Sequence, residues 1–162
     1  MSSSAEPHKY EELRKAVDRL STEVGMPDQL MERMVQFLHE KMLKYNWVGF
    51  YMLEPGTKPP TLALGRFRGA MTPHTRIPLD QGICGAAAAS GKTVVVDDVR
   101  QDSRYLACSL ETKSEIVVPI FVRGSVVGEL DIDSHFPAAF GFEDRELIEH
   151  CAQLVGKHME RA

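Results

Sequence analysis

The sequence predicts a single α+β domain in which an antiparallel sheet carries helices packed on one of its faces. Two observations predict this class. Apolar residues recur at helical spacing near both ends of the 162-residue chain, and segments with strand patterns fill its middle. A chain of this length suffices for one domain with its own core. We expect residues 1–8 to form a disordered tail and residues 9–162 to form the domain, including its N-terminal helices and closing C-terminal helix.

Two amphipathic helices are expected at the start of the domain. The first carries an apolar stripe formed by Tyr10, Leu13, Val17, Leu20 and Val24. Gly25 and Pro27 end that helix, and the second helix carries a stripe of Leu30, Met34, Leu38 and Met42. Methionine commonly fills irregular core space, so we interpret the second stripe as core rather than as a binding surface.

The strands are expected in the middle of the chain. The segments with period-two or continuous apolar patterns are Trp47–Leu53, Thr61–Phe67, Thr93–Val96, Ser114–Val122 and Val126–Asp133. Residues 69–80 are expected to be irregular, and residues 83–90 to form a short alanine-rich helix that ends at Gly91. The polar stretch 97–113 is long enough to form a lid. A closing helix then carries Leu147, Cys151, Leu154 and His158 on one stripe.

Composition excludes several classes of protein. The net charge is −4 and the basic residues form no stripe, so we expect no nucleic-acid partner. The chain has no apolar run that suits a membrane span and no signal-peptide pattern, so we expect a cytoplasmic protein. Thiols stay reduced in that compartment, so the three cysteines predict free or reactive thiols rather than disulfides. The six histidines are scattered and no Cys/His spacing suits zinc, so no metal site is expected.

Acidic residues concentrate on one expected strand. Glu129, Asp131 and Asp133 share a face there with no basic residue between them, and Glu115 lies on the preceding strand of the same hairpin. Alternating acids usually form a solvated sheet face. Acids without basic partners also suit the ammonium group of a ligand. Their repulsion raises the pKa of at least one carboxyl, which supplies a proton donor near neutral pH.

The register of this hairpin decides whether Glu115 joins the other acids. A two-residue turn at Arg123-Gly124 would pair Glu115 with Ile132, on the face opposite to Asp131. A three-residue loop or a bulge would pair Glu115 with Asp133 instead. We expect the longer loop or a bulge, because only then do the four acids share one face.

Two of the three cysteines are candidates for chemistry. Cys108 lies in a polar loop, which is an unusual place for an inert buried cysteine. Cys84 begins the short helix, where the helix dipole can lower the pKa of a thiol. Cys151 lies on the apolar stripe of the closing helix and is interpreted as a core residue. Position alone leaves a structural role open for both Cys108 and Cys84.

Aromatic residues offer a second candidate feature. Trp47 and Tyr51 share one face of the first strand. They are interpreted either as core residues or as an aromatic wall which, opposite acids, would hold a small zwitterion with an apolar or cationic end. His74, His135 and His150 are interpreted as surface residues or as residues that contact the site residues without touching a ligand.

Six segments carry a resemblance to a known family, namely 46–51, 76–78, 82–85, 106–108, 114–119 and 130–134. The motifs Gly82-Ile-Cys-Gly85 and Leu130-Asp-Ile-Asp-Ser134 are specific when they occur together in this order. On these motifs the chain resembles the free methionine-(R)-sulfoxide reductases, which are stand-alone GAF domains, over roughly residues 46–144.

The resemblance implies a GAF domain with about six antiparallel strands, helices on one face of the sheet and a pocket on the other. It also implies a homodimer that reduces free methionine-(R)-sulfoxide. Matched by position, Cys108 is the attacking cysteine. The residues implied to surround the substrate are Trp47, Tyr51, Glu115, Asp131 and Asp133, with the aromatic pair near the methyl group and the acids at the amino group and sulfoxide oxygen.

The implied chemistry uses thiols and no bound cofactor. An acid protonates the sulfoxide oxygen, the Cys108 thiolate attacks sulfur, methionine leaves, and Cys108 becomes a sulfenic acid. A second thiol then condenses with it to a disulfide, which thioredoxin reduces. The family commonly has a further cysteine just before the Arg76-Ile-Pro78 segment, where this chain has His74. Cys84 is therefore the resolving candidate near the site, and an external thiol is the alternative.

Two other functions stay open. A non-catalytic GAF module would bind a small ligand for sensing, although such modules usually act on an attached output domain and little chain follows the closing helix. A redox switch would use Cys84 and Cys108 only to report oxidation by forming a disulfide.

Overall fold

The computed structural model describes residues 5–106 and 110–162 of the chain. Cys108, the predicted nucleophile, lies outside the described residues. The helices are α1 (Ala5–Glu23), α2 (Pro27–Lys41), α3 (Gly82–Ser90) and α4 (Phe142–Arg161). The strands are β1 (Trp47–Leu53), β2 (Thr61–Arg68), β3 (Arg76–Pro78), β4 (Val94–Val96), β5 (Ser114–Val122) and β6 (Ser125–Ser134).

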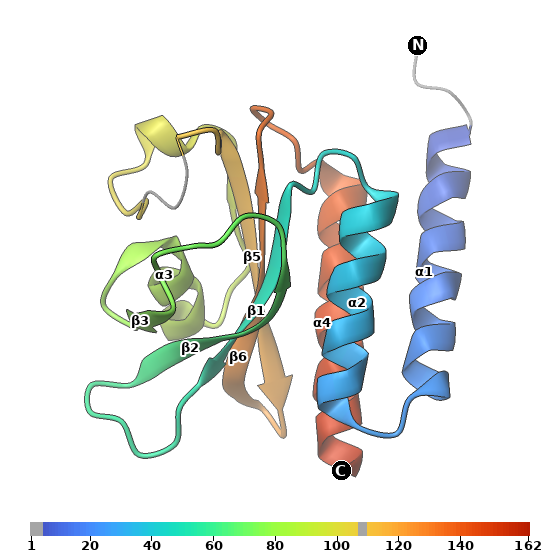
Figure 1. Ribbon diagram of the computed structural model, residues 1–162, viewed down its shortest axis with the longest axis horizontal. Coiled ribbons are helices and arrows are strands. Elements are labelled where there is room, and N and C mark those ends of the chain that lie inside the picture. Colours follow the sequence, from blue (N-terminus) through green and yellow to red (C-terminus); the bar gives the residue numbers. More distant parts are fainter. Residues whose placement is uncertain (1–4, 107–109) are drawn as a thin grey trace.

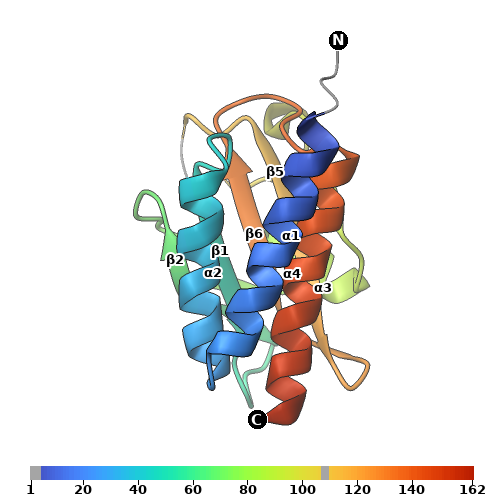
Figure 2. The ribbon, with the colours of Figure 1, turned by 90° about the vertical axis from the view of Figure 1, so that its right-hand side faces the viewer.

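The six strands form one antiparallel sheet in the order β3-β2-β1-β6-β5-β4. Helices α2 and α4 cover one face of it, α1 packs outside them, and α3 lies on the opposite side (Figures 1 and 2). The predicted α+β class is confirmed, with its helices at the two ends of the chain on one face. The other face is left for α3 and the loops, which is where a pocket can form.

The helix stripes become the main core. Leu30, Met34 and Leu38 of α2 and Leu147 and Cys151 of α4 are fully buried against the sheet. Burial of such a stripe is the main stabilisation of an amphipathic helix. The methionine stripe is therefore core, as expected. In the part of the chain that the structure describes, no helix is long and apolar enough to cross a membrane.

Three boundaries differ from the sequence expectations. Helix α1 begins at Ala5, so it takes in part of the segment 1–8 that was expected as a tail. Strand β3 lies in the stretch 69–80 that was expected to be irregular. It pairs only three residues with β2, at the edge of the sheet where a proline is tolerated, and so short an element has no periodic signal. A 3-10 turn, Val99–Gln101, interrupts the long polar loop.

The β5–β6 hairpin has both a tight turn and a bulge. Val122 lies opposite Ser125, so the turn has two residues, and Arg123 and Gly124 both have positive φ, at 50° and 81°. A type I′ turn requires such angles. The register then shifts by one residue between Ile120 and Phe121, and Glu115 lies opposite Asp133. The expected bulge is confirmed, and it brings Glu115 to the face that carries the other acids.

Candidate active site

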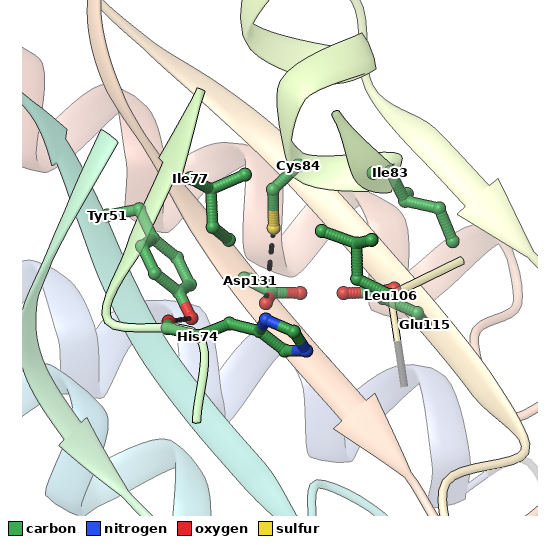
Figure 3. Close-up of a pocket in the computed structure, with 9 residues that line it drawn as sticks. Tyr51, His74, Ile77, Ile83, Cys84, Leu106, Glu115 and Asp131 are labelled. Atoms are coloured by element: carbon green, nitrogen blue, oxygen red, sulfur yellow. Dashed lines mark hydrogen bonds between the residues drawn. The ribbon is translucent and has the colours of Figure 1, made fainter. Parts of the chain in front are cut away.

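A small pocket opens on the face of the sheet that carries α3. Its enclosed volume is about 20 Å³, far below the range of roughly 300–1,000 Å³ typical for drug-sized ligands. Four residues expected at a site line it, namely Tyr51, Cys84, Glu115 and Asp131 (Figure 3). The sequence did not predict the other lining residues, which are His74, Ile77, Gly82, Ile83 and Leu106. The pocket therefore combines acids, a thiol and apolar side chains around a small enclosed space.

Strand pairing assembles the acids of the pocket. Glu115 on β5 lies opposite Asp133 on β6, and Asp131 is two residues from Asp133 on the same face. Glu115 and Asp131 are buried, with 4% and 3% of their surfaces exposed. Helix α3 places the Cys84 thiol above them, and its Sγ donates a hydrogen bond of 3.4 Å to Oδ2 of Asp131. The sulfur and the acids thus form one buried cluster.

The pKa values of Glu115 and Asp131 are raised above those of ordinary carboxyl groups. Burial raises the pKa of Glu115, and the charges of Asp131 and Asp133, together with hydrogen bonding to them, raise it further. Burial also raises the pKa of Asp131, while hydrogen bonds from Glu115 and Cys84 partly oppose that shift. Glu115 is therefore the group that keeps the proton, and Asp131 is the one that ionises first. The direction of this shift agrees with the expectation that crowding raises the pKa of at least one of these acids.

The expectation for the Cys84 thiol was wrong in direction. The start of α3 was expected to lower its pKa, yet burial raises it well above the usual value, and the charges of Asp131, Glu129 and Glu115 add to the increase. Desolvation and three acids outweigh the dipole of a nine-residue helix. Cys84 is therefore a protonated thiol at neutral pH rather than an activated nucleophile.

Glu129 shares the face of β6 that carries Asp131, but it does not line the pocket. Its side chain is 0% exposed, and it sits on β6 opposite Tyr51 of β1 and Pro119 of β5. Neither carboxylate oxygen has a hydrogen-bond partner among the described residues. Burial and the charge of Asp131 raise its pKa well above the usual value, with a smaller opposing effect from the Cys84 thiol. The buried form of Glu129 is therefore neutral.

Replacing Glu129 with glutamine is expected to stabilise the protein at alkaline pH. The folded pKa of Glu129 is above its unfolded value of 4.5, so the wild type loses stability as pH rises from that value through the raised folded pKa. Glutamine has no such loss. Thermal unfolding should show a Tm higher by a few degrees at about pH 8, where about 1 kcal/mol shifts Tm by 2–4 °C, and little difference at about pH 4. Glu146→Gln on exposed α4 surface is the control, and an equal shift at both pH values would contradict the explanation.

The aromatic pair forms a wall and also holds a loop. The rings of Trp47 and Tyr51 lie 6.1 Å apart on one face of β1. Trp47 Nε1 donates a hydrogen bond of 3.0 Å to the carbonyl of Ala70, and the Tyr51 hydroxyl donates one of 2.7 Å to the carbonyl of His74. The loop between β2 and β3 is thereby fixed over the sheet. Of this aromatic pair, only Tyr51 lines the pocket. Trp47 lines a second hollow instead, together with Asp133, which was also expected at the substrate.

Adding a methyl group at Gly49 is expected to displace the Trp47 ring. A Cβ at this position would overlap that ring, which also stacks on Phe67 at 5.7 Å. Gly49→Ala should cost about 1–3 kcal/mol of stability, as overpacking usually does, and should change the fluorescence of the single tryptophan. Gly25→Ala, where an added Cβ meets no atom within 4 Å, is the matched control. Unchanged fluorescence in Gly49→Ala would show that Trp47 does not cross this glycine.

His74 is a pocket residue that the sequence did not identify as one. It is half-buried and its imidazole points into the pocket (Figure 3). Its backbone N–H donates to Thr72 Oγ1 at 3.1 Å and its carbonyl accepts from Tyr51. His135 and His150, the other two histidines considered above, lie outside the pocket: His135 Nε2 is 3.5 Å from a carboxylate oxygen of Glu111, and His150 contacts Asp18. The only sequence feature that could have indicated this is that His74 stands where the family that the chain resembles commonly has a cysteine.

Comparison with known proteins places the chain in a family. Residues 27–159 match the GAF domain. The free methionine-R-sulfoxide reductase of Escherichia coli (strain K12) is 39% identical over 118 residues, which cover 72% of this chain and 68% of that protein. The Saccharomyces cerevisiae (strain ATCC 204508 / S288c) protein of that name is 40% identical over 113 residues, or 69% of this chain and 62% of that protein.

A solved structure agrees over nearly the whole chain. The free methionine-R-sulfoxide reductase from Neisseria meningitidis, determined in complex with its substrate, superposes with a TM-score of 0.89 at 34% identity. The match covers 99% of this chain and 93% of that one. The expected GAF fold is confirmed, and the chain belongs to the GAF domain proteins and, among them, to the free methionine-R-sulfoxide reductase family.

Proposed function

We propose that this chain reduces free methionine-(R)-sulfoxide to methionine with its own thiols. The observation that supports this most is the buried pocket in which Glu115, Asp131 and Cys84 meet. A sulfoxide oxygen needs a proton before it can leave, and Glu115 is an acid that still holds one at neutral pH. Leu106 lines the same pocket, two positions before Cys108 in the sequence.

The proposed first step transfers oxygen to Cys108. Asp131, as the acid that ionises first, accepts hydrogen bonds from the substrate ammonium group, and Glu115 gives its proton to the sulfoxide oxygen. The Cys108 thiolate attacks the sulfoxide sulfur and takes the oxygen, so methionine leaves and Cys108 becomes a sulfenic acid. Tyr51 closes the pocket on one side, and Trp47 and Asp133 extend the site into the neighbouring hollow.

The proposed second step restores the thiol. A thiol condenses with the Cys108 sulfenic acid, a disulfide forms and water leaves. Cys84 supplies this thiol, or an external thiol does so. The Cys84 thiol donates a hydrogen bond to Asp131, so Asp131 can accept its proton as the disulfide forms. Thioredoxin then reduces the disulfide. We further propose a homodimer and a cytoplasmic location, both on the resemblance to the family.

The experiment that tests the function is an NADPH-coupled assay with thioredoxin and thioredoxin reductase. Three substrates are compared: free methionine-(R)-sulfoxide, the free (S) epimer and a peptide-bound sulfoxide. We expect turnover of the free (R) form alone, because the related reductases are named for that epimer and the small pocket has no room for a peptide. Binding of the sulfoxide without turnover, even with dithiothreitol, would instead identify a sensing module. Oxidant-dependent disulfide formation without sulfoxide turnover would identify a redox switch.

Replacing Cys84 with serine tests which thiol resolves the sulfenic acid. If Cys84 does so, turnover with thioredoxin should fall by about 10-fold or more, because thioredoxin acts on a disulfide. Turnover with dithiothreitol should change little, since a small thiol can attack Cys108 directly. Cys151→Ser is the matched control, because Cys151 is buried in the core on the other face of the sheet. Equal turnover with thioredoxin in Cys84→Ser and wild type would assign resolution to an external thiol.

A further inference from the structure

The pocket gathers three metal-ligand atoms from three distant segments of the chain. The Cys84 sulfur comes from α3, and the carboxylate oxygens of Glu115 and Asp131 come from β5 and β6. These atoms all lie within 4.8 Å of one another, and all three residues are buried. Thiolate sulfur and carboxylate oxygen are both ligands of Zn²⁺ in proteins.

The spacing of two of these atoms fits one tetrahedral ion. With a Zn–S distance of about 2.3 Å and a Zn–O distance of about 2.1 Å, tetrahedral geometry separates the two ligand atoms by about 3.6 Å. Cys84 Sγ and Asp131 Oδ2 are 3.4 Å apart. An ion could therefore replace the hydrogen bond between them with little movement of either side chain.

Buried oxygen atoms without partners point independently to a positively charged occupant. Asp131 Oδ1 and both oxygens of the adjacent Glu129 have no hydrogen-bond partner among the described residues. Buried polar atoms are nearly always paired, so such a group of acceptors is unusual. The described lining of the pocket contains no lysine or arginine to neutralise them. A cation that displaces the proton of an acid here would give these oxygens a partner.

The donor types favour a zinc-like ion over an ammonium group alone. An ammonium group needs only acceptors, which the acids supply. A thiol has little to add for it but is a preferred ligand for Zn²⁺. The donor set of the cluster is thus one sulfur and two carboxylate oxygens.

We propose that this pocket binds Zn²⁺ through Cys84, Glu115 and Asp131, and that the ion and the sulfoxide substrate exclude each other. No electron is transferred. The exclusion of substrate rests on the proposed function, whereas the binding of the ion does not.

The test uses Co²⁺ as a spectroscopic probe and Zn²⁺ as its competitor on the reduced full chain. We expect a sulfur-to-cobalt charge-transfer absorption that added Zn²⁺ abolishes. Cys84→Ser should lose the band and weaken Zn²⁺ binding by about 100-fold or more, while Cys151→Ser, in the core on the other face of the sheet, keeps the band. Asp131→Asn should weaken Zn²⁺ binding by at least about 10-fold, which provides a second variant if Cys84→Ser folds poorly. Circular dichroism checks the fold of each variant.

Two results would overturn the proposal. One is a charge-transfer band that persists in Cys84→Ser, and the other is no saturable binding of Co²⁺ or Zn²⁺ to the wild type. These measurements contain no sulfoxide, so they stand whether or not the chain is a reductase. Calorimetric titration of sulfoxide into apo and Zn²⁺-loaded protein then tests exclusion, and equal sulfoxide affinity in both would refute that part.

Discussion

Replacing Cys108 with serine is expected to lower the rate of methionine formation by a factor of about 10³ or more. A hydroxyl is a far poorer nucleophile than a thiolate, and it cannot carry the transferred oxygen as a sulfenic acid. The acids and the aromatic wall stay in place, so binding of free methionine-(R)-sulfoxide should be retained. Methionine is quantified with dithiothreitol as reductant, which removes any dependence on thioredoxin.

The control for this variant is Cys151→Ser. Cys151 is fully buried against the sheet on the helix side, away from the pocket, so its replacement should affect stability but not the chemical step. Turnover by Cys108→Ser at the wild-type rate would exclude Cys108 as nucleophile. Cys84 would then be the remaining cysteine beside the acids, and its raised pKa would have to be reconciled with that role.

Replacing Glu115 with glutamine is expected to lower kcat by about 10²- to 10⁴-fold, the usual contribution of a general acid. Burial and the neighbouring carboxylates raise the pKa of Glu115, so its proton is available at neutral pH and is lost as pH rises through the raised value. The wild-type kcat should therefore fall on the alkaline side. The Glu115→Gln variant should lack that fall, because glutamine does not titrate.

Asp131→Asn is the matched comparison for Glu115→Gln. Asp131 lies on the neighbouring strand and ionises before Glu115, so its loss should act mainly on KM through the substrate ammonium group. The two variants thus separate proton donation from binding. An unchanged alkaline limb in Glu115→Gln would assign the titrating acid to another residue, with Asp131 the first to examine.

The acid cluster could be predicted from the sequence because side chains two residues apart on a strand point to the same face. Alternation on β6 puts Glu129, Asp131 and Asp133 on one face, and no lysine or arginine interrupts them. Whether Glu115 shares that face depends on the pairing of β5 with β6, because a shift by one residue moves Glu115 to the opposite face. A bulge is a local irregularity with no periodic signal, so it could be expected only from the requirement that the acids meet.

Other properties of the site depend on burial and could not be read from the sequence. The position of Cys84 at a helix start suggested a lowered pKa, but the acids that reverse the shift come from β5 and β6. His74 enters the pocket because Trp47 and Tyr51 fix the loop that carries it. Ligand spacing along the sequence could not show the Cys84, Glu115 and Asp131 cluster, since its members are distant in sequence.

The most direct test of the account is a single-turnover reaction without any added reductant. Fully reduced wild-type protein is mixed with excess free methionine-(R)-sulfoxide, and methionine is counted per chain while the thiols are examined by mass spectrometry. The account predicts about one methionine per chain and oxidation at Cys108, as a sulfenic acid or a disulfide. No methionine, with Cys108 still a thiol, would contradict it.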